Sequence, residues 1–199
     1  NMNFNHLNHL LQWRTQEHPE RVAFTYFKQG EIEERSLRYH DLDQQARAIA
    51  SLLQEQNLYH KRVLLLYPPS LDFITAFLGC LYAGVIAVPA YPPELNRLEH
   101  TFRRLWAIIE DAQVSALLTT KEMKEAGKNF LSQLPSLPVI VSDSVSLKQA
   151  SHWIEPELNR NSLAFLQYTS GSTGHPKGVM ISHHNLLANA DMIQNTFQS

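Results

Sequence analysis

The chain has 199 residues, of which 44% are hydrophobic, so it can fill the core of one large α/β domain or of two small ones. Its 17 Lys and Arg residues against 19 Asp and Glu residues give a formal charge of −2, which argues against a nucleic-acid or anionic-membrane partner. The single cysteine, Cys80, excludes an internal disulfide. Residues 1–9 are polar and lack the pattern of a signal peptide, so we expect a cytoplasmic protein.

The first third of the chain is predicted to form a short helix, a β-hairpin and a long helix. These elements cover about residues 7–13 (helix), 22–28 and 31–37 (strands) and 39–56 (helix). The hairpin turn is expected at Gln29 and Gly30, because glycine readily adopts a positive φ. The long helix is predicted from apolar residues that recur at helical spacing and would bury one face.

Strands and helices are then predicted to alternate to the end of the chain. The strands cover about residues 63–67, 85–90, 114–119, 137–141 and 163–168, and the helical segments cover 70–82, 98–112 and 121–134. Such alternation predicts an α/β fold with a largely parallel sheet flanked by helices. The polar stretch 142–161 is the only plausible linker, but Trp153 and Ile154 argue against a free tether, so one continuous domain over residues 1–199 is expected.

An uncharged stretch, residues 73–90, is close in length to a membrane-spanning helix. Its pattern changes from helical spacing to a β-branched run that begins at Val85, and Gly84 and Pro89 interrupt it. A buried helix followed by a buried strand fits this pattern better. We therefore expect no integral membrane segment.

A loop rich in glycine and hydroxyl residues follows the last predicted strand, in the sequence YTSGSTGHPKGVM. The candidate phosphate-binding residues are Thr169, Ser170, Gly171, Ser172, Thr173, Gly174 and Lys177. Glycines let backbone N–H groups approach a polyphosphate, hydroxyls donate to its oxygens, and Lys177 adds a positive charge. The pattern departs from the P-loop of NTPases, because Lys177 follows Pro176 and precedes Gly178. A flexible linker is the alternative, but a strand and a helix starting near Ser182 frame the loop closely and favour an anion site.

At these residues the sequence resembles the adenylate-forming superfamily, which includes acyl-CoA synthetases, luciferases and nonribosomal adenylation domains. The resemblance implies that the loop and Lys177 hold the β- and γ-phosphates of ATP with Mg²⁺ while a carboxylate attacks the α-phosphorus. It implies a catalytic role for Lys177 beside a main catalytic lysine beyond Ser199. It also implies that residues 1–199 are the N-terminal portion of the large adenylation domain. We therefore expect these 199 residues to be inactive by themselves.

Three further segments are similar to the fatty acyl-AMP ligase branch of this superfamily, namely VPAYPP (88–93), the helix 98–112 and the run from Leu166 to Asn189. That branch implies a fatty acid substrate and transfer to an acyl carrier protein or to a carrier domain of a polyketide or nonribosomal synthase. The loop by itself leaves open an acyl-CoA synthetase or another carboxylate-activating adenylation domain. A nucleotide-binding module without turnover is a third alternative.

The remaining chemically reactive residues have competing interpretations. His183 is a candidate for lining the acyl or adenylate site, and a histidine bonded to backbone near a helix start is an equal alternative. His6 and His9 are interpreted as surface or packing residues, because no cysteine or acidic residue stands at ligand spacing, and no metal site is predicted. Cys80 is interpreted as a buried thiol, and the apolar helix face around Phe77 as core.

Overall fold

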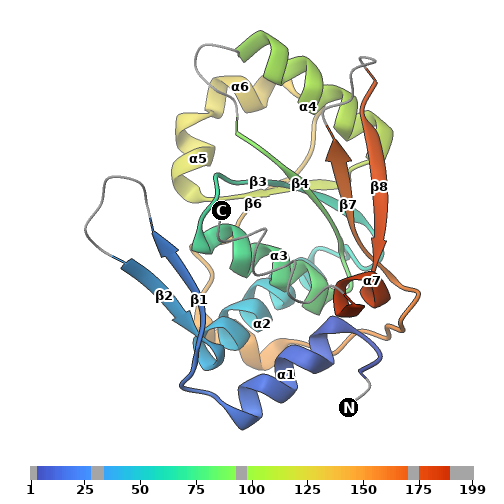
Figure 1. Ribbon diagram of the computed structural model, residues 1–199. Helices are drawn as coiled ribbons and strands as arrows, with labels where there is room; N and C mark the ends of the chain where they lie inside the picture. Colours follow the sequence, from blue (N-terminus) through green and yellow to red (C-terminus); the bar gives the residue numbers. More distant parts are fainter. Residues whose placement is uncertain (1–3, 28–33, 93–97, 170–174, 189–199) are drawn as a thin grey trace.

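The computed structural model describes residues 4–27, 34–92, 98–169 and 175–188 (Figure 1). In the described residues the helices are α1 (Leu7–Glu17), α2 (Tyr39–Glu55), α3 (Leu71–Ala83), α4 (Leu98–Ala112), α5 (Lys121–Ala126), α6 (Lys128–Gln133), the 3-10 helix η1 (Leu147–His152) and α7 (His183–Ala188). The strands are β1 (Val22–Phe27), β2 (Glu34–Arg38), β3 (Arg62–Leu66), β4 (Ile86–Ala90), β5 (Ala116–Thr119), β6 (Val139–Val141), β7 (Leu163–Thr169) and β8 (Lys177–Ser182).

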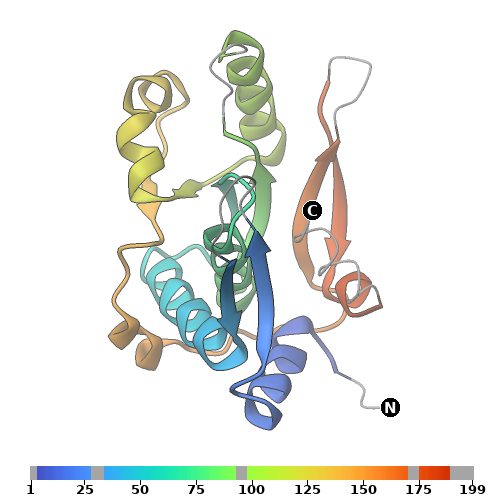
Figure 2. The ribbon, with the colours of Figure 1, turned by 60° about the vertical axis from the view of Figure 1, so that its left-hand side comes forward.

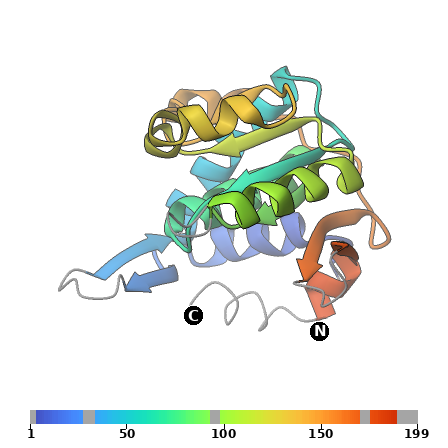
Figure 3. The same cartoon turned by 90° about the horizontal axis from the view of Figure 1, so that it is seen from above.

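The N-terminal hairpin predicted from the sequence is present. Strands β1 and β2 pair antiparallel as a separate two-stranded sheet, which projects from the body at the left of Figure 3. The turn predicted at residues 29–30 lies outside the described residues. Helix α2 follows directly, and its N-cap residue Arg38 makes no side-chain capping hydrogen bond.

The main sheet is mixed, with strand order β6-β5-β3-β4-β7-β8. The pairs β3–β4, β3–β5, β5–β6 and β4–β7 are parallel, and the pair β7–β8 is antiparallel. The prediction of a largely parallel sheet flanked by helices is therefore confirmed. The sequence prediction missed β8, where the segment after the loop forms a strand before helix α7 begins. The helical segment predicted over 121–134 is divided at Gly127 into α5 and α6.

Alternate residues of the buried strands contribute to two hydrophobic cores, one on each face of the sheet. Val63, Leu65, Ala87 and Leu118 join a core with helices α1, α2 and α3. Their neighbours Leu64, Leu66, Val88 and Leu117 join a second core with α4. This period of two is expected when both faces of a parallel sheet are covered by helices.

The uncharged stretch forms helix α3 and strand β4, as the sequence predicted. Phe77 is 1% exposed and Cys80 is fully buried. The interpretation of Cys80 as a buried thiol is confirmed, and burial raises the pKa of this thiol. None of the described helices is long and apolar enough to cross a membrane.

The polar stretch between β6 and β7 is fixed to the body of the protein. The Trp153 ring stacks on Tyr82 at a centroid distance of 5.2 Å, and its Nε1–H donates to the Tyr82 carbonyl at 2.7 Å. The Ile154 side chain is exposed, yet the Gln54 side chain binds both the N–H and the carbonyl of Ile154. The stretch is thus an anchored connection that delivers the chain to the start of β7.

Candidate active site

The candidate phosphate loop connects β7 to β8, which stand together at one side of the molecule (Figure 2). Thr169 at the end of β7 pairs in register with Lys177 at the start of β8. Because β7 runs parallel to β4, Thr169 lies at the carboxyl edge of the sheet, where ligands bind in open α/β sheets. The predicted loop residues Ser170, Gly171, Ser172, Thr173 and Gly174 lie outside the described residues.

Thr169 and Lys177, the two predicted site residues that flank the loop, are both exposed. Within the described part of the chain, Lys177 forms no ion pair. The hairpin register thus brings one hydroxyl and one ammonium group to the same edge. Together these groups can donate to, and balance the charge of, a polyphosphate.

A tyrosine immediately before the loop ties the hairpin to helix α4. The Tyr168 hydroxyl donates to Asp111 Oδ2 at 2.5 Å. Burial, followed by this hydrogen bond and the nearby carboxylate, raises the pKa of Tyr168. The sequence analysis did not identify this pair, because 57 positions separate the two residues and no local pattern connects them.

Gly178 leaves room for the Tyr168 ring across the hairpin. A Cβ at Gly178 would lie 2.8 Å from Tyr168 Cζ, and the ring is held by its hydroxyl at Asp111. We expect Gly178→Ala to lower the free energy of unfolding by about 1 kcal/mol, measured by urea denaturation. Val179→Ala at the neighbouring exposed position is the control and should change it by less than about 0.5 kcal/mol. Equal effects of the two substitutions would contradict the close approach.

His183 is buried between α7 and α1, with 1% of its surface exposed. Its Nδ1 accepts a hydrogen bond from the Leu7 backbone N–H at 3.2 Å, and the ring centroid lies 5.8 Å from that of His6. Burial, with a smaller effect from His6, lowers the pKa of His183 to about 4. The neutral imidazole therefore fastens the start of α7 to α1. A contact of His183 with the acyl or adenylate group stays a prediction.

Acidification should weaken this contact. The pKa of His183 is about 4 in the folded state against an ordinary value of 6.5, so between these pH values the unfolded chain binds more protons. Stability must then fall as the pH falls through this window, and a protonated Nδ1 would also face the Leu7 N–H donor. We expect His183 to contribute a loss on the order of 2 kcal/mol between pH 7 and pH 5, measured by urea denaturation, in addition to the loss from His6, whose pKa burial also lowers to about 4. His183→Gln should show a smaller loss; an equal loss would contradict the assignment.

The sequence matches the AMP-binding enzyme family over residues 11–199. The chain belongs to the AMP-binding enzyme family. This family assignment confirms the superfamily that the loop sequence indicated, and the helix-flanked mixed sheet confirms the fold that the alternation of strands and helices predicted.

Similar relatives within the family include fatty acid ligases. The chain is 45% identical over 195 residues to the medium-chain-fatty-acid–acyl-carrier-protein ligase JamA of Moorena producens, covering 96% of this chain and 33% of JamA. It is 40% identical over 159 residues to a long-chain-fatty-acid–AMP ligase of Mycolicibacterium smegmatis, covering 78% of this chain and 25% of that protein.

The structural similarity agrees with the sequence similarity. The crystal structure of a fatty acyl-adenylate ligase from Legionella pneumophila, in complex with acyl adenylate and pyrophosphate, superimposes with a TM-score of 0.83 and 39% identity. The alignment covers 94% of this chain and 32% of that structure. The chain thus spans about a third of the length of the relatives that it matches.

Proposed function

We propose that the protein containing this chain activates a fatty acid with ATP. In this reaction a carboxylate oxygen attacks the α-phosphorus of ATP, the α–β phosphoanhydride bond breaks, and acyl-AMP and pyrophosphate form. The main observation behind the proposal is that Thr169 and Lys177, at the two ends of a phosphate-loop sequence, pair across the β7–β8 hairpin. The similarity to a ligase crystallised with acyl adenylate and pyrophosphate supports it further.

In this proposal the loop residues 169–174 hold the phosphate groups and Lys177 balances their negative charge. Phosphoryl-transfer catalysis depends mainly on alignment and on neutralisation of charge, which fits a glycine-rich loop followed by an exposed lysine. Mg²⁺, when bound with ATP, supplies further charge neutralisation at the phosphate oxygens. Among the described residues, the exposed Thr169 carries a hydroxyl that can bind Mg²⁺ or donate to a phosphate.

The proposed second step transfers the acyl group to the phosphopantetheine thiol of an acyl carrier protein, or of a carrier domain in a polyketide or nonribosomal synthase. The thiol sulfur attacks the acyl carbon, and AMP leaves. The name of JamA as an acyl-carrier-protein ligase supports this acceptor over coenzyme A. We also propose that residues 1–199 are the N-terminal portion of the large adenylation domain and that the protein acts in the cytoplasm.

Product analysis by mass spectrometry tests the acceptor. The full-length protein is incubated with Mg·ATP and a panel of fatty acids, with phosphopantetheinylated carrier protein and coenzyme A offered in separate reactions. Transfer mainly to the carrier is expected. Efficient acyl-CoA formation would assign the protein to the acyl-CoA synthetases, and the absence of any acyl-AMP or thioester would indicate a nucleotide-binding module without turnover.

A further inference from the structure

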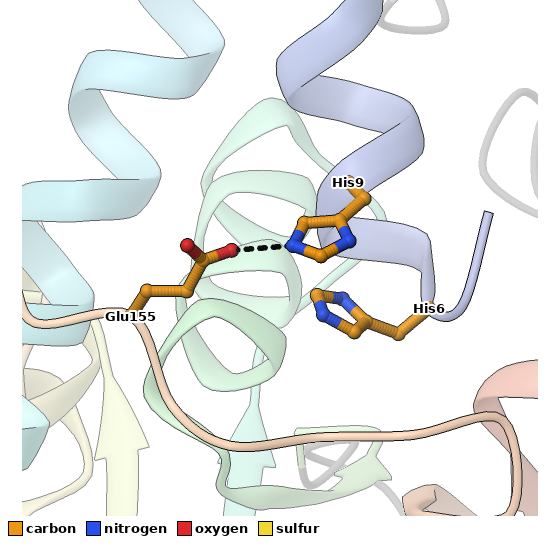
Figure 4. A group of neighbouring side chains, drawn as sticks. All are labelled: His6, His9 and Glu155. Carbon is orange, nitrogen blue, oxygen red and sulfur yellow. Dashed lines mark ion pairs between the residues drawn. The ribbon is translucent and has the colours of Figure 1, made fainter.

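Two histidines and a glutamate converge on the side of the molecule where α1 meets the connection to β7 (Figure 4). His9 Nε2 lies 2.8 Å from Glu155 Oε1, and the His6 and His9 rings have a centroid distance of 3.8 Å. One donor atom from each of the three residues can be chosen so that all lie within 4.8 Å of one another. The sequence analysis predicted no metal site, because Glu155 is far from the histidines in the chain and only the fold brings it there.

The backbone segments that carry these side chains are fixed on both sides of the cluster. His6 and His9 lie one turn apart on α1 and its N-cap, so they project from the same face. Glu155 follows Ile154, whose N–H and carbonyl are bound by Gln54. Two residues after Glu155, the Glu157 carbonyl accepts a hydrogen bond from the Tyr59 hydroxyl. The two backbone segments that carry the three groups are therefore fixed before any ligand arrives.

One ring nitrogen of the cluster has no hydrogen-bond partner among the described residues. His6 is 2% exposed, and within the described residues its Nδ1 is buried without a partner. A buried polar atom of this kind is rare and requires an explanation, of which a missing ion is one. The cluster also borders a cavity of about 610 Å³, lined in addition by Tyr59, His60 and Ser162, which gives an ion and water a way in.

We propose that His6, His9 and Glu155 bind a divalent transition-metal ion, with Zn²⁺ the best fit and water in the fourth position. Two imidazole nitrogens and one carboxylate oxygen form a donor set that suits Zn²⁺, whereas Mg²⁺ and Ca²⁺ prefer oxygen atoms alone. Tetrahedral ligands of Zn²⁺ lie about 3.4 Å apart. Donor atoms as far apart as 4.8 Å must therefore approach by roughly 1 Å, whereas His9 Nε2 and Glu155 Oε1, now 2.8 Å apart, must separate slightly. His9 and Glu155 have room to move, since 42% of each side chain is exposed.

The bound ion would join α1 to the connection between η1 and β7. It would replace the direct contact of His9 with Glu155 by two metal–ligand bonds. Because this connection ends where β7 starts, the ion would stabilise the anchoring of the strand that leads to the phosphate loop. The simpler alternative is an ion pair between His9 and Glu155 that needs no metal.

Metal titration of the untagged, metal-free full-length protein distinguishes these two cases. Isothermal titration calorimetry should show Zn²⁺ binding that is weakened at least about tenfold by His9→Gln and by Glu155→Gln. The exposed residues His152 and Glu122 provide matched controls, and His152→Gln and Glu122→Gln should leave this binding unchanged. Co²⁺ should give the visible absorption bands of a tetrahedral site in the wild type and lose them in both cluster variants.

Thermal unfolding provides a second measurement that does not depend on the variants folding equally well. Zn²⁺ should raise the melting temperature of the metal-free wild type and should raise that of Glu155→Gln by less. Mg²⁺ should leave the melting temperatures of both proteins unchanged. The proposal is overturned if Zn²⁺ binding and stabilisation are the same in the wild type and in both cluster variants. It is equally overturned if the wild type binds no Zn²⁺ and Glu155→Gln merely lowers the melting temperature.

Discussion

Lys177→Met in the full-length protein is expected to slow fatty-acid-dependent ATP–pyrophosphate exchange by about 100-fold or more. The substitution keeps an unbranched side chain of similar length and removes the charge. Removal of one pre-positioned electrostatic donor commonly costs a factor of about 100 to 1,000 in rate. The structure supports this role because Lys177 is exposed, pairs with Thr169 at the carboxyl edge of the sheet, and has no ion-pair partner among the described residues.

Lys124 provides the matched control for this prediction. It is also exposed but lies in α5, away from the β7–β8 hairpin, so Lys124→Met should retain the wild-type rate. Both variants should keep the wild-type melting temperature, because neither removes a buried contact. If Lys177→Met exchanged pyrophosphate as fast as Lys124→Met, Lys177 would have no part in binding the phosphates.

The second large effect is expected at the contact of helices α2 and α3. A Cβ at Gly79 would lie 2.6 Å from Ile49 Cγ2 and 2.8 Å from Ile49 Cβ, and Ile49 is 4% exposed. Gly79→Val would force the helices apart within the first hydrophobic core. We expect a loss of about 3 kcal/mol in the free energy of unfolding, measured by urea denaturation.

A double-mutant cycle isolates the cause of this loss. Ile49→Ala removes Cγ2, the nearest atom that the new side chain would strike, although it leaves Cβ of residue 49 in place. By itself it should cost about 2–5 kcal/mol. In the double variant, the valine side chain introduced by Gly79→Val would occupy part of the vacated space. The combined loss should therefore be at least about 1 kcal/mol smaller than the sum of the single losses. Simple additivity would show that the two residues do not meet as the structure has them.

The elements with strong local patterns were predictable from the sequence. The spacing of apolar residues predicted helix α2. The change from helical spacing to β-branched residues predicted that helix α3 is followed by strand β4. Strand β8 was not recognised, because residues 177–182 are mostly exposed and their sheet partner is supplied by β7. Pairing between strands, rather than local preference, fixes this strand.

In the candidate site, too, the features that are local in sequence were predictable and the contacts between distant residues were not. The glycine and hydroxyl residues of the loop and Lys177 are contiguous in sequence, so their shared chemistry was visible. The hydrogen bond of Tyr168 to Asp111 joins residues 57 positions apart. The ion pair of Glu155 with His9 joins the connection before β7 to helix α1. No local signal could have identified these pairs, because each residue type is common in segments of this kind.

The most direct test of acyl-adenylate formation is to measure the transfer of oxygen from the fatty acid to AMP. The full-length protein is supplied with Mg·ATP, a fatty acid labelled with ¹⁸O in both carboxyl oxygens, and phosphopantetheinylated carrier protein. Attack of the carboxylate on the α-phosphorus, followed by thiolysis at the acyl carbon, must leave one ¹⁸O atom in AMP. We expect singly labelled AMP by mass spectrometry; unlabelled AMP, or ADP with phosphate, would contradict acyl-adenylate formation.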